Sequence, residues 1–183
     1  MRSQTQQEII DGCKGLNPKY QKALVLKYSA LLMATSRRYV SDRAYAKDVL
    51  QESFIKILRA FPKYRDQGSL EGWMKKIVVN TALSYFDKAC FKREFHGYET
   101  MPEEWSDPAI FPQLAADELV ELINRLPDGF RTIFNLYAVE GYSHKEIGAL
   151  LGIEASTSRS QLTRARKLLA DFLSKREKNK IRI

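Results

Sequence analysis

Cysteine and histidine are scarce in this chain, which has two of each among 183 residues. Cys13 and Cys90 lie far apart, and neither has a cysteine or histidine nearby at the spacing of metal ligands. We interpret both as ordinary thiols of a reducing compartment. His96 lies at a predicted domain edge, and we expect His144, near the start of a helix, to be exposed. The sequence therefore predicts no metal site and no cofactor.

Catalytic motifs are missing as well. The sequence has no glycine-rich loop that would cradle phosphate, no G-x-S-x-G motif and no pair of carboxylates in an apolar context. We therefore expect a protein that is not an enzyme and that has no small-molecule substrate.

Long apolar runs are also missing. No stretch approaches the length of a membrane span, and the first residues, MRSQTQQEII, lack the apolar core of a signal peptide, so we expect a cytoplasmic protein. Hydrophobic residues still make up 44% of the chain, enough to bury a core. The net charge of +8 favours a polyanionic partner, either nucleic acid or an anionic membrane surface.

The predicted fold is all-α, with two small helical domains joined by a flexible acidic linker. Apolar residues recur at helical spacing over residues 19–40, 44–60 and 69–89, and again from residue 116. Pro18 stands where the first of these helices can start, and Ser69 is expected to cap the third through Gly72. The recurring residues of the first helix are Leu24, Leu26, Tyr28, Leu31, Leu32, Thr35 and Tyr39. Residues 97–117 contain three prolines and five acidic residues but no lysine or arginine, which is typical of a linker. We place the first domain at 1–96, the linker at 97–115 and the second domain at 116–183, with a frayed end from residue 174.

A helix-turn-helix pattern lies between Gly141 and Leu169. Ser143 and Glu146 form a capping box at the start of its first helix, and Gly152 supplies the left-handed residue that ends it. Cations and hydroxyls alternate with the inner residues of the second helix, as in a helix that reads the major groove. The alternative is an ordinary helical hairpin with a solvated basic face. The inner residues are small or apolar: Ser158, Leu162, Ala165, Leu169 and Phe172.

Aromatic and basic residues alternate in the first domain between residues 61 and 93. This pattern suits opened DNA, because bases stack on aromatic rings while cations follow the phosphates. The loop FPKYRDQGSL at 61–70 is suited to hold flipped bases beside the helix that carries Asn80 and Ser84. The alternative is that Trp73 and Tyr85 are core residues, and that the acidic face around Glu52 is only a solvated helix surface.

Three segments then carry a family pattern in order: YAKDVLQESFIKILRAF, SLEGWMKKIVVNTALSYF and LPDGFRTIFNLYAVEGYSHKEIGALLGIEASTSRSQLTRARKLL. They resemble segments of bacterial sigma factors of the extracytoplasmic-function group, within the sigma-70 family. The resemblance covers nearly the whole chain. It implies an alternative sigma factor that binds core RNA polymerase and directs promoter-specific transcription initiation at minus-ten and minus-thirty-five elements.

The resemblance also assigns three sets of residues. Those that would bind core polymerase are Asp48, Gln51, Glu52, Phe54 and Ile55. Those that would contact the minus-ten element are Lys63, Tyr64, Arg65, Trp73, Lys76, Asn80 and Ser84. Those that would contact the minus-thirty-five element are Lys145, Ser156, Thr157, Arg159, Ser160, Thr163, Arg164 and Lys167.

The implied partners are promoter DNA, core RNA polymerase and an anti-sigma factor, either free or membrane-bound. On the polymerase they are the clamp helices of the largest subunit and the flap of the second-largest. Two other functions remain open: a stand-alone helix-turn-helix regulator that never binds polymerase, and a nucleic-acid enzyme such as a nuclease. The regulator would leave the acidic face around Glu52 unused, and the nuclease would need convergent acids or histidines.

Some residues of the second domain depart from the family pattern. Glu154 stands where a serine usually caps the recognition helix, so either Ser156 caps it or Glu154 acts through its charge at the helix start. Ser158 replaces a usual valine, Gln161 a common arginine and Gly148 a common alanine.

Overall fold

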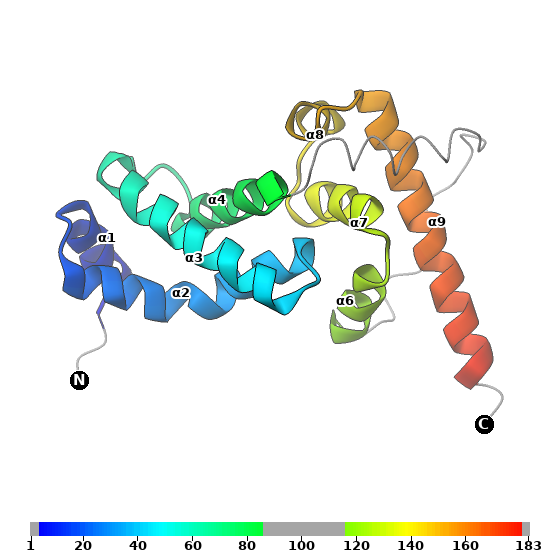
Figure 1. Cartoon of the computed structure of the whole chain (residues 1–183), viewed down its shortest axis with the longest axis horizontal. Coiled ribbons are helices and arrows are strands. Elements are labelled where there is room, and N and C mark those ends of the chain that lie inside the picture. Colours follow the sequence, from blue (N-terminus) through cyan, green and yellow to red (C-terminus); the bar gives the residue numbers. More distant parts are fainter. Residues whose placement is uncertain (1–3, 86–115, 181–183) are drawn as a thin grey trace. The chain divides into compact units, whose positions relative to one another are not determined.

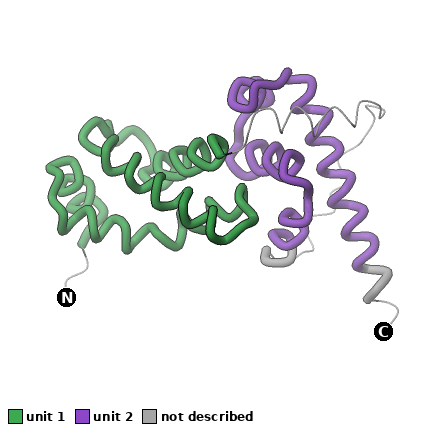
Figure 2. The backbone as a smooth tube through the Cα atoms, viewed as in Figure 1, with its two compact units in different colours: residues 1–85 green, residues 86–183 purple. Residues whose placement is uncertain are grey.

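A computed structural model of the chain describes the backbone of residues 4–85 and 116–180, and the side chains of residues 4–85 and 119–176. Every regular element in these ranges is a helix, which confirms the all-α prediction (Figure 1). Contacts divide the chain into two units, Met1–Tyr85 and Phe86–Ile183 (Figure 2). The predicted linker at 97–115 and the predicted boundary at residue 96 lie outside the described residues. No helix in the described part of the chain is both long and apolar enough to cross a membrane.

Unit 1 consists of helices α1 (Gln6–Lys14), α2 (Pro18–Tyr39), α3 (Arg43–Ala60) and α4 (Leu70–Tyr85), with a 3₁₀ turn η1 (Phe61–Lys63) after α3. Helix α2 packs against α1, α3 and α4, and α3 packs against α4. The sequence pattern had not indicated α1. Its signal is the capping box of Thr5 and Glu8, which precedes the buried Ile9, Ile10 and Cys13.

Side-chain caps set the starts of these helices. Asn17 accepts from the amide of Lys19, and Pro18 occupies the first helical position, as predicted. Asp42 accepts from the amides at the start of α3. The predicted cap at Ser69 is confirmed, since its Oγ accepts from the amide of Gly72 at 3.3 Å. The chain thus encodes its own helix starts in unit 1.

The core of unit 1 follows one stripe of α2. Leu26 was grouped with that stripe, and this was wrong: its side chain is 70% exposed. It lies two residues after Leu24, which on a helix is about 200° around the axis and therefore on the opposite side. The buried stripe is Leu24, Tyr28, Leu32, Thr35 and Tyr39.

Unit 2 consists of α6 (Ala116–Asn124), α7 (Asp128–Phe134), a π-helical turn η3 (Asn135–Val139), α8 (His144–Leu151) and α9 (Ala155–Lys180). Helix α9 packs against α6, α7 and α8, and its buried residues include Ser158, Leu162, Ala165 and Leu169. The predicted inner stripe is therefore confirmed for these four residues, whereas Phe172, its predicted fifth member, is only half-buried and Leu173 is buried instead. The helix extends to Lys180, past residue 174, where we predicted that a frayed end begins.

A buried arginine braces the turn between α6 and α7. Arg131 is 2% exposed. Its guanidinium pairs with Asp128 at 2.5 Å and also donates to the carbonyls of Asn124 and Leu126, both at 3.4 Å. These bonds satisfy a charge that would otherwise be costly to bury, so Arg131 fixes the entry into α7.

Candidate functional site

The outward side of α3 carries an acidic face, defined here as Asp48, Gln51, Glu52 and Ile55. The spacing of three, one and three residues places them on one side of the helix. Three of them are exposed and Glu52 is half-buried. Phe54, which was predicted to lie with them, is only 8% exposed and belongs to the core, because it falls on the inner stripe with Ser53. The helix therefore offers carboxylates to solvent.

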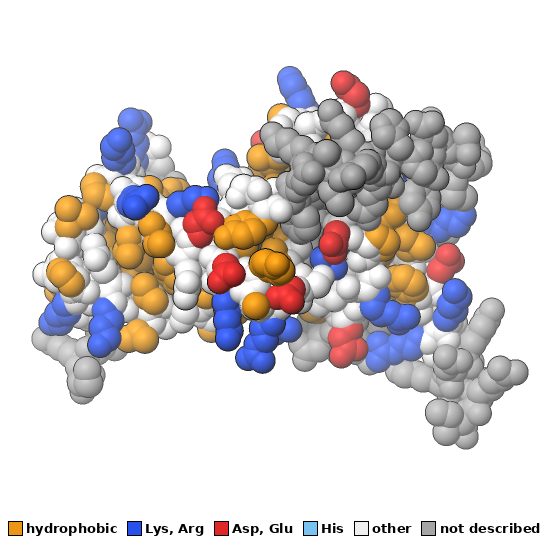
Figure 3. All heavy atoms as spheres, viewed as in Figure 1, with side chains coloured by type: hydrophobic (Ala, Val, Ile, Leu, Met, Phe, Trp, Pro, Cys, Tyr) orange, Lys and Arg blue, Asp and Glu red, His pale blue; other side chains and the backbone are white. Residues whose placement is uncertain are grey.

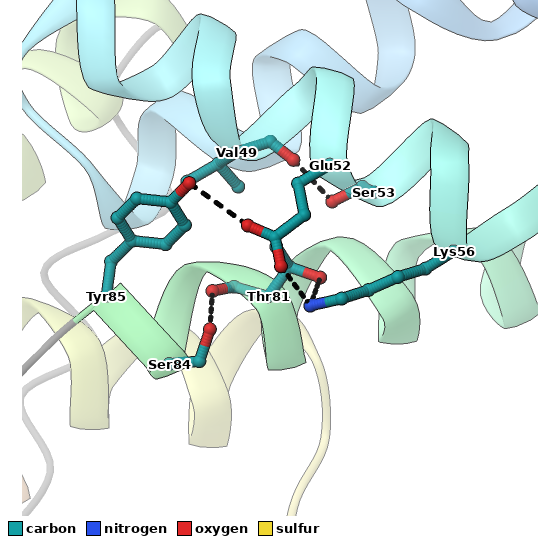
Figure 4. Close-up of polar contacts among 7 residues, drawn as sticks. All are labelled: Val49, Glu52, Ser53, Lys56, Thr81, Ser84 and Tyr85. Atoms are coloured by element: carbon teal, nitrogen blue, oxygen red, sulfur yellow. Dashed lines mark hydrogen bonds and ion pairs between the residues drawn. The ribbon is translucent and has the colours of Figure 1, made fainter.

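Two side chains, Tyr85 and Lys56, hold the Glu52 carboxylate of this face in place (Figure 4). Its Oε2 accepts from the hydroxyl of Tyr85 at 3.0 Å, and its Oε1 pairs with Lys56 Nζ at 2.6 Å. Lys56 also donates to Oγ1 of the buried Thr81 at 3.2 Å, and Ser84 donates to the Thr81 carbonyl at 2.7 Å. These contacts connect α3 to the last described turn of α4.

The same contacts decide the charges at this site. The hydrogen bonds from Lys56 and Tyr85 lower the pKa of Glu52, and the hydrogen bond to Glu52 raises the pKa of Tyr85. Near neutral pH, Glu52 is therefore a carboxylate and Tyr85 a protonated donor. The same two helices also expose large apolar side chains: Tyr45 and Ile55 of α3 are 60% and 50% exposed, and Tyr85 of α4 is 47% exposed. Figure 3 shows acidic and hydrophobic side chains next to one another over α3.

The loop after η1 is supported by three aromatic rings. Tyr64 packs on Trp73 at 4.7 Å and on Phe61 at 5.7 Å between ring centroids, and Phe61 meets Trp73 edge-on at 5.4 Å. Tyr64, predicted to contact DNA, is 7% exposed, so it supports the loop from beneath instead of lining its surface. Trp73 is half-buried, which leaves part of its ring at the surface.

The remaining minus-ten candidates lie on two neighbouring segments. Lys63 and Arg65 flank Tyr64 and are both exposed. The loop then turns through two left-handed residues, Asp66 with φ of 53° and Gly68 with φ of 92°. Helix α4 adds an outward stripe at steps of three and four residues, composed of Trp73, Lys76, Asn80 and Ser84.

The helix-turn-helix of unit 2 forms as predicted. The amide of Ser143 donates to Glu146 Oε2 at 2.8 Å, and Ser143 Oγ accepts from the amide of Glu146 at 3.3 Å. Gly152 is left-handed, with φ of 69°. Helix α9 begins directly after Glu154, so Ser156 is its second residue and does not cap it. Glu154 occupies the cap position, where a negative charge suits the helix N-terminus.

The candidate minus-thirty-five residues lie along the first turns of α9 and at the start of α8. Ser160 donates to the Thr157 carbonyl at 3.0 Å, and Thr163 donates to the Arg159 carbonyl at 3.2 Å, so both hydroxyls retain lone pairs for an outside donor. The exposed members are Lys145, Ser156, Arg159 and Ser160. The half-buried members are Thr157, Thr163, Arg164 and Lys167.

His144 contradicts the prediction that it is an exposed helix residue. It is half-buried, its Nδ1 lies 2.9 Å from Ser158 Oγ, and its ring stacks on Tyr137 at 4.6 Å between centroids. Burial lowers the pKa of His144, and the charges of Arg159 and Arg166 lower it further. No local pattern indicated this contact, because the two partners lie on different helices.

Comparison with known proteins matches both units. Residues 24–90 match a family model described as Sigma-70 region 2, and residues 116–169 match one described as Sigma-70, region 4. The ECF RNA polymerase sigma factor SigE of Mycolicibacterium smegmatis is 32% identical over 162 residues, which cover 83% of this chain and 61% of that protein. The chain thus spans less than two thirds of that relative.

Other relatives are matched over most of their length. The RNA polymerase sigma-H factor of Pseudomonas aeruginosa is 28% identical, over 80% of this chain and 82% of that protein. The ECF RNA polymerase sigma-E factor of Haemophilus influenzae is 26% identical, over 90% and 93%. A solved structure of the sigma factor RpoE in complex with the anti-sigma factor NepR from Bartonella quintana has the same fold, with a TM-score of 0.50, 22% identity, and coverage of 84% and 96%.

Proposed function

The chain belongs to the sigma-70 family, in the extracytoplasmic-function group of RNA polymerase sigma factors, and from this premise we propose that it binds core RNA polymerase and directs transcription initiation at specific promoters. The observation that carries the proposal is the presence of regions 2 and 4 in one chain, with the region 2 match almost wholly on unit 1 and the region 4 match within unit 2. It favours an initiation factor over a stand-alone helix-turn-helix regulator, which would need only the second unit.

The proposed polymerase contact is the acidic face of α3, docked on the clamp helices of the largest subunit. Glu52 is ionised and held by Tyr85 and Lys56, so little ordering is needed when a basic partner approaches. Complementary charge would steer the encounter and set its register, while the exposed Ile55 and Tyr45 supply apolar area. The buried Phe54 supports α3 from inside.

The proposed minus-ten contact is the loop after η1 together with the outward stripe of α4. Lys63, Arg65 and Lys76 are exposed cations suited to phosphates, and Asn80 has the amide that pairs with base edges. The exposed part of Trp73 offers a surface for a base that has left the duplex.

The proposed minus-thirty-five contact is the start of α9 in the major groove. Arg159 is exposed and can span the two acceptors of guanine, while Lys145 and Lys167 suit phosphates. The remaining candidates in this set are Ser156, Thr157, Ser160, Thr163 and Arg164.

Further partners belong to the same proposal. The solved relative is described in complex with an anti-sigma factor, and we propose an anti-sigma partner for this chain, free or membrane-bound. A groove in unit 2 is a candidate binding site for the flap of the second-largest polymerase subunit. The groove is lined by Glu121, Leu122, Arg125, Phe172, Lys175 and Arg176.

The proposed protein works in the cytoplasm, has no catalytic role and uses no cofactor.

Reconstituted transcription tests the proposal. Purified full chain is mixed with core RNA polymerase and a library of promoter fragments, and run-off products are sequenced. We expect transcripts that start downstream of a shared pair of elements, and co-elution of the chain with core enzyme. Core enzyme alone is the control. The absence of both transcripts and co-elution would overturn the proposal, and co-elution without initiation would restrict it to polymerase binding.

A further inference from the structure

A polar contact joins the two helices of the helix-turn-helix. His144 is the first residue of α8, and Ser158 lies one turn into α9. The imidazole Nδ1 and the serine Oγ are 2.9 Å apart. Ser158 is fully buried and directly precedes Arg159, the exposed residue proposed to read bases.

The contact extends to a third element. Tyr137 of η3 stacks on the imidazole with an interplanar angle of 18°, and the guanidinium of Arg166 lies 5.9 Å from the centre of the same tyrosine ring. Elements η3, α8 and α9 therefore meet around His144, near the N-terminal end of α9, which is the proposed recognition helix.

Such a contact constrains the helices differently from apolar packing. Ser158 interrupts the inner stripe, so α9 loses dispersion contacts there, and a buried hydroxyl without a partner is costly. His144 supplies that partner. Dispersion forces depend weakly on direction, whereas a hydrogen bond tolerates only a narrow range of angles. The pair thus restricts rotation of α9 about its own axis relative to α8.

We propose that His144 and Ser158 are positioning residues for promoter recognition, whose hydrogen bond sets the direction in which the neighbouring Arg159 leaves α9. The proposal rests on the proposed function, since it assumes that α9 reads DNA. Removal of either partner would let α9 turn slightly and would weaken base discrimination by Arg159. Contacts to phosphates, made by flexible cations around the site, would change little.

The charge state of the ring agrees with this role. Burial and the charges of Arg159 and Arg166 lower the pKa of His144, so the imidazole is neutral near pH 7. A neutral ring does not repel Arg159 and is tolerated at the N-terminus of α8, where a positive charge is unfavourable.

Base preference, measured on the full chain, tests the proposal. A pool of short duplexes randomised across the upstream element is bound by wild type and by the variants S158A, H144A, H144A/S158A and H144N. The bound fraction is sequenced, and the thermal midpoint and the salt dependence of binding are measured for each. The matched control is S174A, an exposed serine on the same helix that donates to the Asp171 carbonyl.

For S158A and H144A, we expect the ratio of affinity for the preferred duplex to affinity for a random duplex to fall by about threefold to tenfold. The dependence of binding on salt concentration should not change. The double variant should lose no more than either single one, because the two side chains act as a pair. Asparagine places an amide near the position of Nδ1, so H144N should restore most of the ratio, and S174A should match wild type.

Two outcomes would overturn the proposal. One is an unchanged ratio in S158A and H144A with only a lower thermal midpoint, which would make the pair merely structural. The other is additive loss in the double variant. A wild type without any base preference would instead contradict the proposed function, so the two failures are distinguishable. If H144A does not fold, the comparison of S158A with H144N decides.

Discussion

The hydroxyl of Tyr85 donates a hydrogen bond to Glu52 Oε2 at 3.0 Å, and this bond joins the last described residue of α4 to the acidic face of α3. Lys56 closes the connection by contacting both Glu52 and Thr81. The proposed polymerase contact and the helix that carries the proposed minus-ten contacts are thus linked through one carboxylate. A displacement of either helix at this point would strain the hydrogen bonds that join it to the other helix.

Tyr85→Phe should lower stability in a pH-dependent way. The folded protein lowers the pKa of Glu52 from its ordinary value of 4.5, so the bond stabilises the fold above that value and its contribution is lost as the pH falls through the lowered pKa. The site is partly exposed, so the loss in unfolding free energy near pH 7 should be at most about 1 kcal/mol. Chemical denaturation near neutral pH and in acid measures it. A difference that persists unchanged in acid would contradict the pH dependence.

Glu52→Lys should weaken binding to core polymerase by about tenfold or more at low salt, because a repulsive contact replaces an attractive one. Affinity for core enzyme at two salt concentrations measures this, and the loss should shrink at high salt. Glu71→Lys, an equal charge change at an exposed position of α4, is the control and should retain affinity. Unchanged affinity of Glu52→Lys would show that the acidic face is not the polymerase contact.

Arg159→Ala should change which upstream elements are bound. Loss of a bidentate base contact costs about 1–3 kcal/mol at the base it reads and leaves other positions unaffected. Competition among duplexes that differ at single positions measures the effect. An equal loss on every duplex would make Arg159 a phosphate contact.

Gly148→Ala should destabilise unit 2, although alanine is more favourable than glycine inside a helix by about 1 kcal/mol. A Cβ at Gly148 would lie 2.7 Å from the carbonyl oxygen of Ile153, so the turn would have to move, at a cost of about 1–3 kcal/mol. Thermal unfolding measures the balance. The matched control is Gly72→Ala, where the nearest atom is at an ordinary 3.6 Å, and it should be neutral or slightly stabilising. An equal effect at both glycines would contradict the steric argument.

His144 should make stability depend on pH below about 6.5. Its pKa is lowered in the folded state by burial and by Arg159 and Arg166, so the unfolded chain takes up the proton first and stability falls as the pH drops through this range. The difference in unfolding free energy between wild type and His144→Asn, measured from about pH 7.5 to pH 5, isolates this residue. A constant difference would contradict the assigned shift.

Local features of the fold could be predicted from sequence because neighbours along the chain decide them. The capping box of Ser143 and Glu146, the left-handed Gly152 and the start of α2 at Pro18 are all confirmed. The family pattern also indicated the protein family before any contact was known. Helix α1 was overlooked although its capping box is a local signal.

The errors share a different cause. Leu26 is apolar but faces outward, Tyr64 is aromatic but buried beneath its loop, and His144 is polar but half-buried. Sequence patterns show which residues are apolar, aromatic or charged, whereas the packing of neighbouring elements decides which of these residues are covered.

The sequence by itself determined the helices, their caps, the basic charge and the residues on offer at each surface. Tertiary structure alone decided which of them meet: Glu52 with Tyr85, 33 residues apart, and His144 with Ser158, 14 apart. Helical hydrogen bonding couples residues only three or four positions apart, so contacts between helices depend on how their faces pack. Because of this packing, His144, which was predicted to be exposed, joins two helices, and the carboxylate of Glu52 is held by hydrogen bonds.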